Sequence, residues 1–378
     1  MKVDAILLIS TLILALGFQF LQNEKRQYFN GAFHPGKIVH VEERLVNFQD
    51  TIPNDTVYIC FSERNSPLAI YREIRTGVCL EGVCLPVYLN IYWTVSGNYL
   101  GYQLGEGEVL TKNEHEPFTE HDYEKLHSLL NDPQSLLANY TLAEIASGNT
   151  NTEQVDGVSG ATKSDLRGYI IKGAAYTTHT LWHVVYGPSR DSVMNISSAY
   201  ASSLLLSNMI SSSDRQDKIW AVRQFKEKAH EFPELIPKIQ ETIQSGDFYL
   251  KEQAIQSLIN AELSDREIQI RLFEAFPMCD FGTKRMIINQ LAECCRLNSE
   301  VVEKIVQQIP IENNAIANLL FTLLNESYQP EPFLVQKVSL LLGHEKKYIS
   351  DAAYNYLSTS GSREPGLEEK LKEYQNRY

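Results

Sequence analysis

Residues 155–165 read VDGVSGATKSD, and their side chains are of the types that surround a bound phosphate group. Gly160 and Ala161 carry almost no side chain, so a bulky group can approach their backbone. Ser159 is a good N-cap, and the free N–H groups at a helix N-terminus favour an anion. Lys163 adds a countercharge. These residues predict either a phosphate site or an ordinary capped helix.

A long helix is expected after this segment, over residues 160–183. One face of it holds Leu166, Ile170, Gly173 or Ala174, Thr177 and Leu181. Such a face can pack on a sheet. The helix would then hold the preceding loop in place.

The spacing of five histidines raises the question of a metal site. His179 and His183 lie four residues apart on the expected helix, a spacing that can bind a metal ion, but the tryptophan between them indicates packing. His115, His121 and His127 recur six residues apart, and no set of cysteines or carboxylates completes a site around them. We interpret all five as packing or solvated side chains and predict no metal site.

The chain has six cysteines, and two of them flank the turn-forming pair Glu-Gly in GVCLEGVCLP. In an exported protein this pattern favours a local disulfide between Cys79 and Cys84. A redox-active dithiol is the alternative, since a metal site would need a second pair of cysteines. A c-type haem would need Cys-x-x-Cys-His, which is absent. Cys294 and Cys295 fall in a helical pattern and are expected to pack in a core.

The first residues have the pattern of an export signal. Lys2 gives a positive start, and residues 5–16 are an unbroken run of apolar and hydroxyl side chains. The run reaches Leu21 at most, near the lower limit for spanning a bilayer. We expect residues 1–22 to be a signal peptide or a membrane anchor, with a buried core helix as the alternative. Either main interpretation places the remainder outside the cytoplasm, in the periplasm or at the cell surface.

Charge and composition narrow the function classes. The formal net charge of −13 and the pI near 5.2 argue against nucleic-acid binding, which needs clustered Lys and Arg. They also argue against peripheral binding to anionic lipid. With 378 residues, 43% of them hydrophobic, the chain is long enough for two or three folded domains.

Residues 36–187 predict one α+β domain. Segments 56–61 and 68–74 are rich in branched and aromatic side chains, as strands are. The next strand alternates, with Val87, Leu89, Ile91 and Trp93 on one face. A hairpin turn is expected at 96–98, a helix over 118–130 with Thr119 as its N-cap, and a further short helix over 132–146.

Beyond residue 200 the apolar residues recur every 33 positions, in four columns. The columns are Phe225, Leu258, Leu291, Leu324 and Leu357; Ala221, Ala254, Ile287, Leu320 and Ala353; Leu235, Ile268, Val301, Leu334 and Leu367; and Ile239, Leu272, Ile305, Val338 and Leu371. Each unit thus holds two helical stripes, and such units bury their apolar faces by stacking on one another.

The repeat resembles HEAT-type repeats in its pattern. It predicts an all-α HEAT-like solenoid of about five αα units over residues 200–378. A compact irregular helical bundle is the alternative. HEAT-like arrays usually bind or space other proteins, so a protein partner is expected on this part of the chain.

The segment DGVSGAT is similar to the flavinylation motif of the FMN-binding domain family, Asp-x-x-Ser/Thr-Gly-Ala-Thr/Ser. This domain occurs in flavin-carrying subunits of the sodium-pumping NADH:quinone reductase and of Rnf-type complexes. The resemblance implies that Thr162 carries FMN through a phosphoester and that Asp156, Ser159, Gly160 and Ala161 are motif positions. It also implies a flavin transferase that uses FAD as donor outside the cytoplasm.

The expected function is therefore that of an exported or membrane-tethered flavoprotein, a redox subunit that relays electrons to a partner in the cell envelope. Two alternatives remain. A flavin-free binding or scaffold protein would act through its helical repeats. In a third interpretation, Cys79 and Cys84 form a thiol–disulfide pair that exchanges electrons with the flavin.

Overall fold

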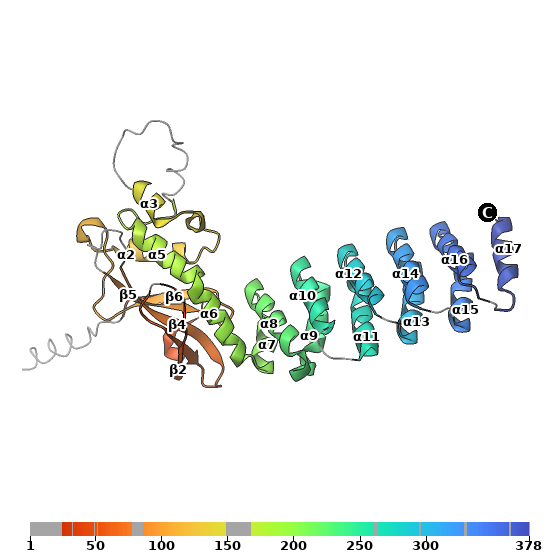
Figure 1. Ribbon diagram of the computed structural model, residues 1–378, viewed down its shortest axis with the longest axis horizontal. Coiled ribbons are helices and arrows are strands. Elements are labelled where there is room, and N and C mark those ends of the chain that lie inside the picture. The colour runs from red at the N-terminus through yellow and green to blue at the C-terminus, as the bar shows by residue number, and fades with distance from the viewer. Residues whose placement is uncertain are drawn as a thin grey trace, which may run out of the picture. The chain divides into compact units, whose positions relative to one another are not determined.

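The computed structural model describes residues 25–31, 33–48, 50, 52–77, 86–148, 168–259, 264–294, 296–328, 331–362 and 364–377. The chain divides into two compact units, Met1–Tyr200 and Ala201–Tyr378 (Figure 1). Within the described ranges, every helix is too short or too polar to span a bilayer. Residues 1–22, the expected signal or anchor, lie outside these ranges.

The first unit is built on an antiparallel sheet of six described strands in the order β1-β6-β5-β4-β3-β2. Strands β2 to β6 form a meander, and β1 is added beside β6. The strands are Gln27–Phe29 (β1), His40–Leu45 (β2), Thr56–Phe61 (β3), Pro67–Thr76 (β4), Val87–Trp93 (β5) and Tyr99–Leu104 (β6). The strands expected over 56–61 and 68–74 are confirmed.

One face of this sheet packs on helices. Val87, Leu89, Ile91 and Trp93 are at most 5% exposed and belong to the same core as the helix residues, which confirms the alternation expected for β5. The hairpin turn after β5 is also confirmed, because Thr94 and Asn98 pair across it and Gly97 has a φ of 80°. Glycine adopts that backbone conformation without strain.

The helices of the first unit are α2 (Glu120–Leu130), α3 (Leu142–Gly148), α5 (Ala175–Tyr186) and α6 (Pro188–Ser197). Helix α2 begins as expected at Thr119, which forms a capping box with Asp122. Helix α5 contacts α2, α3 and α6. It is therefore the central helix over the sheet.

Two expected helices begin or end differently. The helix expected over 132–146 is split into a 3-10 turn, Leu136–Asn139, and α3. Tyr140 between them is extended (φ −120°, ψ 138°), and Thr141 starts a new cap by bonding to Glu144.

The helix expected over 160–183 does not run through its described part. Residues 168–174 are not α-helical, and α5 begins only at Ala175. Gly173 has a φ of 79°, in the left-handed region that interrupts a right-handed helix. Residues 163–174 therefore separate Thr162 from the start of α5.

The opposite face of the sheet carries a row of aromatic rings. Ring centroids lie 4.7 Å apart for Tyr58 and Tyr71, 4.8 Å for Tyr71 and Tyr92, and 5.0 Å for Tyr92 and Phe29. Gly101 makes the last contact possible, because a Cβ there would lie 2.4 Å from the Phe29 ring. The row ties the edge strand β1 to the middle of the sheet.

The second unit is all-helical (Figure 1). Its helices are α7 (Ser203–Ile210), α8 (Arg215–Lys228), α9 (Ile236–Ser245), α10 (Phe248–Ile259), α11 (Asp265–Ala275), α12 (Phe281–Ala292), α13 (Ser299–Gln308), α14 (Asn314–Ser327), α15 (Pro332–Leu340), α16 (Lys347–Thr359) and α17 (Leu367–Arg377). Helices α8, α10, α12, α14 and α16 begin at residues 215, 248, 281, 314 and 347, each 33 after the last.

These helices stack in two layers. Helices α8, α10, α12, α14 and α16 contact one another in succession, and so do α7, α9, α11, α13 and α15. The 33-residue columns form the interior. All members of the columns that begin at Ala221 and Phe225 are at most 2% exposed. In the other two columns Ile268 and Leu371 are half-buried, and the remaining residues are at most 4% exposed.

Polar residues repeat in the same register. Asp214, Asp247, Asp280 and Asn313 lie 33 apart, and each accepts a backbone N–H from the first turn of the helix that follows it. Such caps are worth about 1 kcal/mol each. They fix the starts of α8, α10, α12 and α14.

Of the two adjacent cysteines, Cys294 follows the end of α12 and is half-buried, which differs from the expected core position. Cys295 lies outside the described residues.

Candidate functional site

The candidate flavin residues lie outside the described residues. These are Asp156, Ser159, Gly160, Ala161, Thr162 and Lys163, and the same holds for Cys79 and Cys84. The structure describes the elements on either side of segment 149–167. Helix α3 ends at Gly148, the described chain resumes at Gly168, and α3 packs against α5.

The chain before the segment is anchored by α3. Thr141 and Glu144 form a reciprocal cap, in which the Thr141 N–H donates to the Glu144 carboxylate at 2.7 Å and the Glu144 N–H donates to Thr141 Oγ1 at 3.3 Å. The Thr141 N–H and the Thr141 hydroxyl both donate to this carboxylate, and they lower the pKa of Glu144. Ile145, 3% exposed, places α3 on the core of the unit.

The chain after the segment is held more tightly. Lys125 of α2 donates its ammonium proton to the Ile170 carbonyl at 2.8 Å. The Ile171 side chain is 1% exposed, and its backbone N–H donates to Thr178 Oγ1 at 3.3 Å. Residues 170 and 171 are therefore fixed to both α2 and α5.

Gly173 completes this attachment. Its carbonyl accepts the Asn113 N–H at 2.8 Å. A Cβ at Gly173 would lie 3.2 Å from Lys112 Cβ. Lys112 is itself held by ion pairs with Asp122 at 2.9 Å and Glu116 at 3.3 Å. The close approach and the positive φ both require glycine here.

Helix α5 presents four polar side chains to backbone carbonyls of residues 130–140. His179 Nε2 lies 2.7 Å from the Tyr140 oxygen, Trp182 Nε1 2.9 Å from that of Asp132, His183 Nε2 3.1 Å from that of Leu137, and the Tyr186 hydroxyl 2.8 Å from that of Leu130. A carbonyl only accepts, so both histidines carry the proton on Nε2.

These contacts settle the role of the histidine pair. Burial lowers the pKa of His179, which keeps its ring neutral. The described residues contain no group of three His, Cys, Asp or Glu able to hold a metal ion. His179 and His183 are thus packing residues, as expected, and they bind the chain between α2 and α3 to α5.

The other three histidines also agree with the sequence interpretation. His127 Nδ1 lies 3.0 Å from the Tyr99 hydroxyl, and burial lowers the pKa of its ring. His115 and His121 are exposed.

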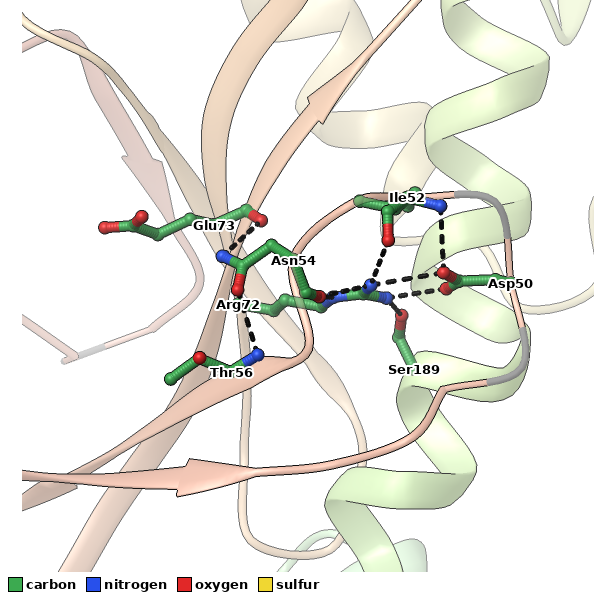
Figure 2. A network of polar contacts seen from close by, with 7 residues as sticks. All are labelled: Asp50, Ile52, Asn54, Thr56, Arg72, Glu73 and Ser189. Atoms are coloured by element: carbon green, nitrogen blue, oxygen red, sulfur yellow. Dashed lines mark hydrogen bonds and ion pairs between the residues drawn. The ribbon is translucent and has the colours of Figure 1, made fainter.

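Arg72 on β4 is fully buried at the centre of a polar network (Figure 2). It donates to the two Asp50 carboxylate oxygens at 2.6 and 3.1 Å and to Ser189 Oγ of α6 at 2.8 Å. It also donates to the backbone oxygens of Ile52 and Asn54. All its donor groups are used, so Arg72 ties the loop before β3 to the sheet and to α6. Sequence reasoning missed this network.

Free positive charge near the segment is limited. Lys112 and Lys125 are occupied by the contacts above, whereas Lys172 is exposed and makes no ion pair with any described residue. The arrangement as a whole is a rigid frame that holds both ends of one segment.

Comparison with models of known protein families finds no match, and neither the curated proteins nor the solved structures give one.

Proposed function

We propose that the protein is an exported or membrane-tethered flavoprotein that carries FMN on Thr162 and relays electrons in the cell envelope. The observation that carries this proposal is the motif DGVSGAT at residues 156–162, which is similar to the flavinylation motif of the FMN-binding domain family. The described elements on either side of segment 149–167 support it, because α3 and residues 170–173 are attached to the core of the unit.

The attachment is a transfer of the FMN group from FAD. The Thr162 hydroxyl oxygen forms the new bond to the FMN phosphorus and loses its proton. The pyrophosphate bond of FAD breaks, and AMP leaves. No electron is gained or lost in this step. A flavin transferase outside the cytoplasm is the partner that it requires.

Two lysines close to Thr162 in sequence would offset the charge of the phosphate. Lys163 is next to the attachment point, and Lys172 has an exposed ammonium group without an ion pair among the described residues. Bound FMN would accept two electrons and pass them on singly. A covalent tether prevents its loss by diffusion outside the cell. The surrounding protein tunes the potential through hydrogen bonds and burial.

We further propose that the second unit is a HEAT-like array that docks a protein partner. Four of its exposed large apolar residues support this, because they repeat with the array: Phe248 and Phe281 are 64% and 47% exposed, and Met278 and Ile311 are 75% and 71% exposed. The members of each pair lie 33 residues apart. A Cβ at Gly282 would lie 3.9 Å from the Phe248 ring, so the two phenylalanine positions are neighbours. Exposed apolar patches of this kind mark interaction sites.

The second candidate function is that of a flavin-free scaffold acting through this array. The same exposed residues favour it. The two functions differ in one property, because a scaffold would carry no flavin even in the presence of a flavin transferase.

The test is the mass of the denatured protein after co-expression with a flavin transferase in an exporting host. An increase equal to FMN less one water supports the flavoprotein. An unchanged mass, with a known flavinylated protein modified in the same cells, rejects it and leaves the scaffold function.

A further inference from the structure

A cleft lies in the second unit between α15 and residues 364–370, around the start of α17. Its volume is about 500 Å³, and its lining includes Phe333, Lys337, Leu340, Pro365, Leu367 and Lys370. All its lining residues belong to the second unit.

The cleft arises where the helix stacking changes. Helices α7, α9, α11, α13 and α15 each contact the next in their layer. Helix α17 instead packs on α16, through Tyr374, whose hydroxyl donates to Asp351 at 2.6 Å. Residues of α15 and residues 364–370 line the two sides of the cleft.

The α15 side of the cleft is mixed, because Gln336, Lys337 and Ser339 line the cleft beside the apolar Phe333, Val335 and Leu340. Phe333 and Leu340 are seven residues apart, which places them on the same side of a helix. Leu340 is 73% exposed, although it lies in a cleft. Leu367 and Pro365 supply apolar surface on the opposite wall. An apolar ligand would cover surface that is otherwise in contact with water.

Two ammonium groups lie beside this apolar surface. Lys370 makes no ion pair with any described residue. Lys337 lies 3.8 Å from Glu303 in an exposed pair, a kind of contact that contributes little. Glu364 is the acidic residue of the lining. The cleft thus combines apolar surface with a small excess of positive charge.

We propose that this cleft binds an amphiphilic monocarboxylate, with its apolar chain against Phe333 and Leu340 and its carboxylate at Lys337 and Lys370. The volume falls in the range of small-molecule sites, about 300–1,000 Å³. The cleft therefore suits a small ligand.

The test uses decanoate with the full-length protein in calorimetric titrations. We expect one saturable site per chain. Decyltrimethylammonium, with the same chain and the opposite charge, should bind at least about tenfold more weakly, as expected for loss of a charge-assisted bond. Acetate, which lacks the apolar chain, should not bind.

Matched variants locate the site. Lys370→Gln should weaken decanoate binding about tenfold, and Lys372→Gln, on an exposed position of the same helix, should not. Leu340→Ser should weaken it to a similar extent, and Leu204→Ser, which changes another exposed leucine, should not. Glu364→Gln should tighten binding. All five positions are exposed or half-exposed, so the variants should fold.

The proposal is overturned if decanoate shows no saturable binding, as it would if the occupant were an acidic peptide. Equal effects of Lys370→Gln and Lys372→Gln, or equal affinity for the cationic amphiphile, would overturn it as well. Flavin attachment at Thr162 does not depend on this cleft, so its outcome is separate.

Discussion

Replacement of Arg72 by leucine is expected to destabilise the first unit by about 3–5 kcal/mol, the usual cost of removing one partner from a buried ion pair. Arg72 is 0% exposed and its partner Asp50 is 19% exposed. The substitution leaves the Asp50 carboxylate and the Ser189 hydroxyl without the guanidinium. Arg72→Lys keeps the charge but loses the planar fork, so its loss should be smaller.

Urea unfolding followed by tryptophan fluorescence measures this loss. In a Trp220→Phe background, Trp93 and Trp182 report on the first unit alone, and they are 0% and 5% exposed. The matched control is Arg75→Leu. Arg75 lies on the same strand but is exposed, with its guanidinium 4.8 Å from the Tyr88 ring centroid. This control should cost less than about 1 kcal/mol.

A double variant distinguishes the stability lost with the ion pair from the stability lost with side-chain packing. Arg72→Leu combined with Asp50→Leu leaves no buried charge unpaired, so it should recover part of the loss seen in Arg72→Leu. The reasoning is refuted if Arg72→Leu costs no more than Arg75→Leu, or if the double variant loses the sum of the two single losses.

Two further predictions concern the frame and the array. Gly173→Ala should destabilise the first unit by about 1–3 kcal/mol, because φ is 79° and Lys112 Cβ is close, whereas Gly168→Ala, with no atom within 4 Å, should be nearly neutral in the same assay. The Lys251 ammonium, with backbone bonding, holds the pKa of Asp280 at about 2, below its ordinary 3.8. The stability that the ionised Asp280 contributes is therefore fully present above about pH 4, and it is lost as the pH falls towards 2. The urea midpoints of wild type and Asp280→Asn should converge over that range, and a constant difference would contradict the assignment.

The parts of the fold that sequence predicted are those set by local apolar periodicity. The alternation in β5 and the 33-residue columns each predicted buried residues from their positions in a repeating element. The N-cap at Thr119 is a local signal as well and was predicted, and the structure adds Asp122 as its capping-box partner.

The two helix errors have different origins. The break at Tyr140 has a local signal in the sequence, the Thr141-x-x-Glu144 cap, and the helix expected over 132–146 runs across it. The start of α5 has a weaker signal in the sequence. Gly173 fits a helix with small residues as well as it fits a turn, and its turn is fixed by contact with Lys112, distant in sequence.

The Arg72 network could not be predicted from local pattern. Asp50 and Ser189 lie 22 and 117 residues away from Arg72. From sequence, an arginine in a strand pattern predicts a solvent-exposed position, and only tertiary packing shows that Arg72 is buried. The candidate flavin residues are a different case, because they rest on motif similarity and lie outside the described residues.

The most direct test of the flavoprotein proposal is the site of the flavin. The protein is co-expressed with a flavin transferase, denatured, digested and mapped by mass, beside Thr162→Ser and Thr162→Ala. The account predicts a yellow protein with FMN on the peptide that contains Thr162, retained in Thr162→Ser and absent from Thr162→Ala. A colourless wild type in cells where the transferase is active, or a Thr162→Ala variant that keeps covalent flavin, would contradict it.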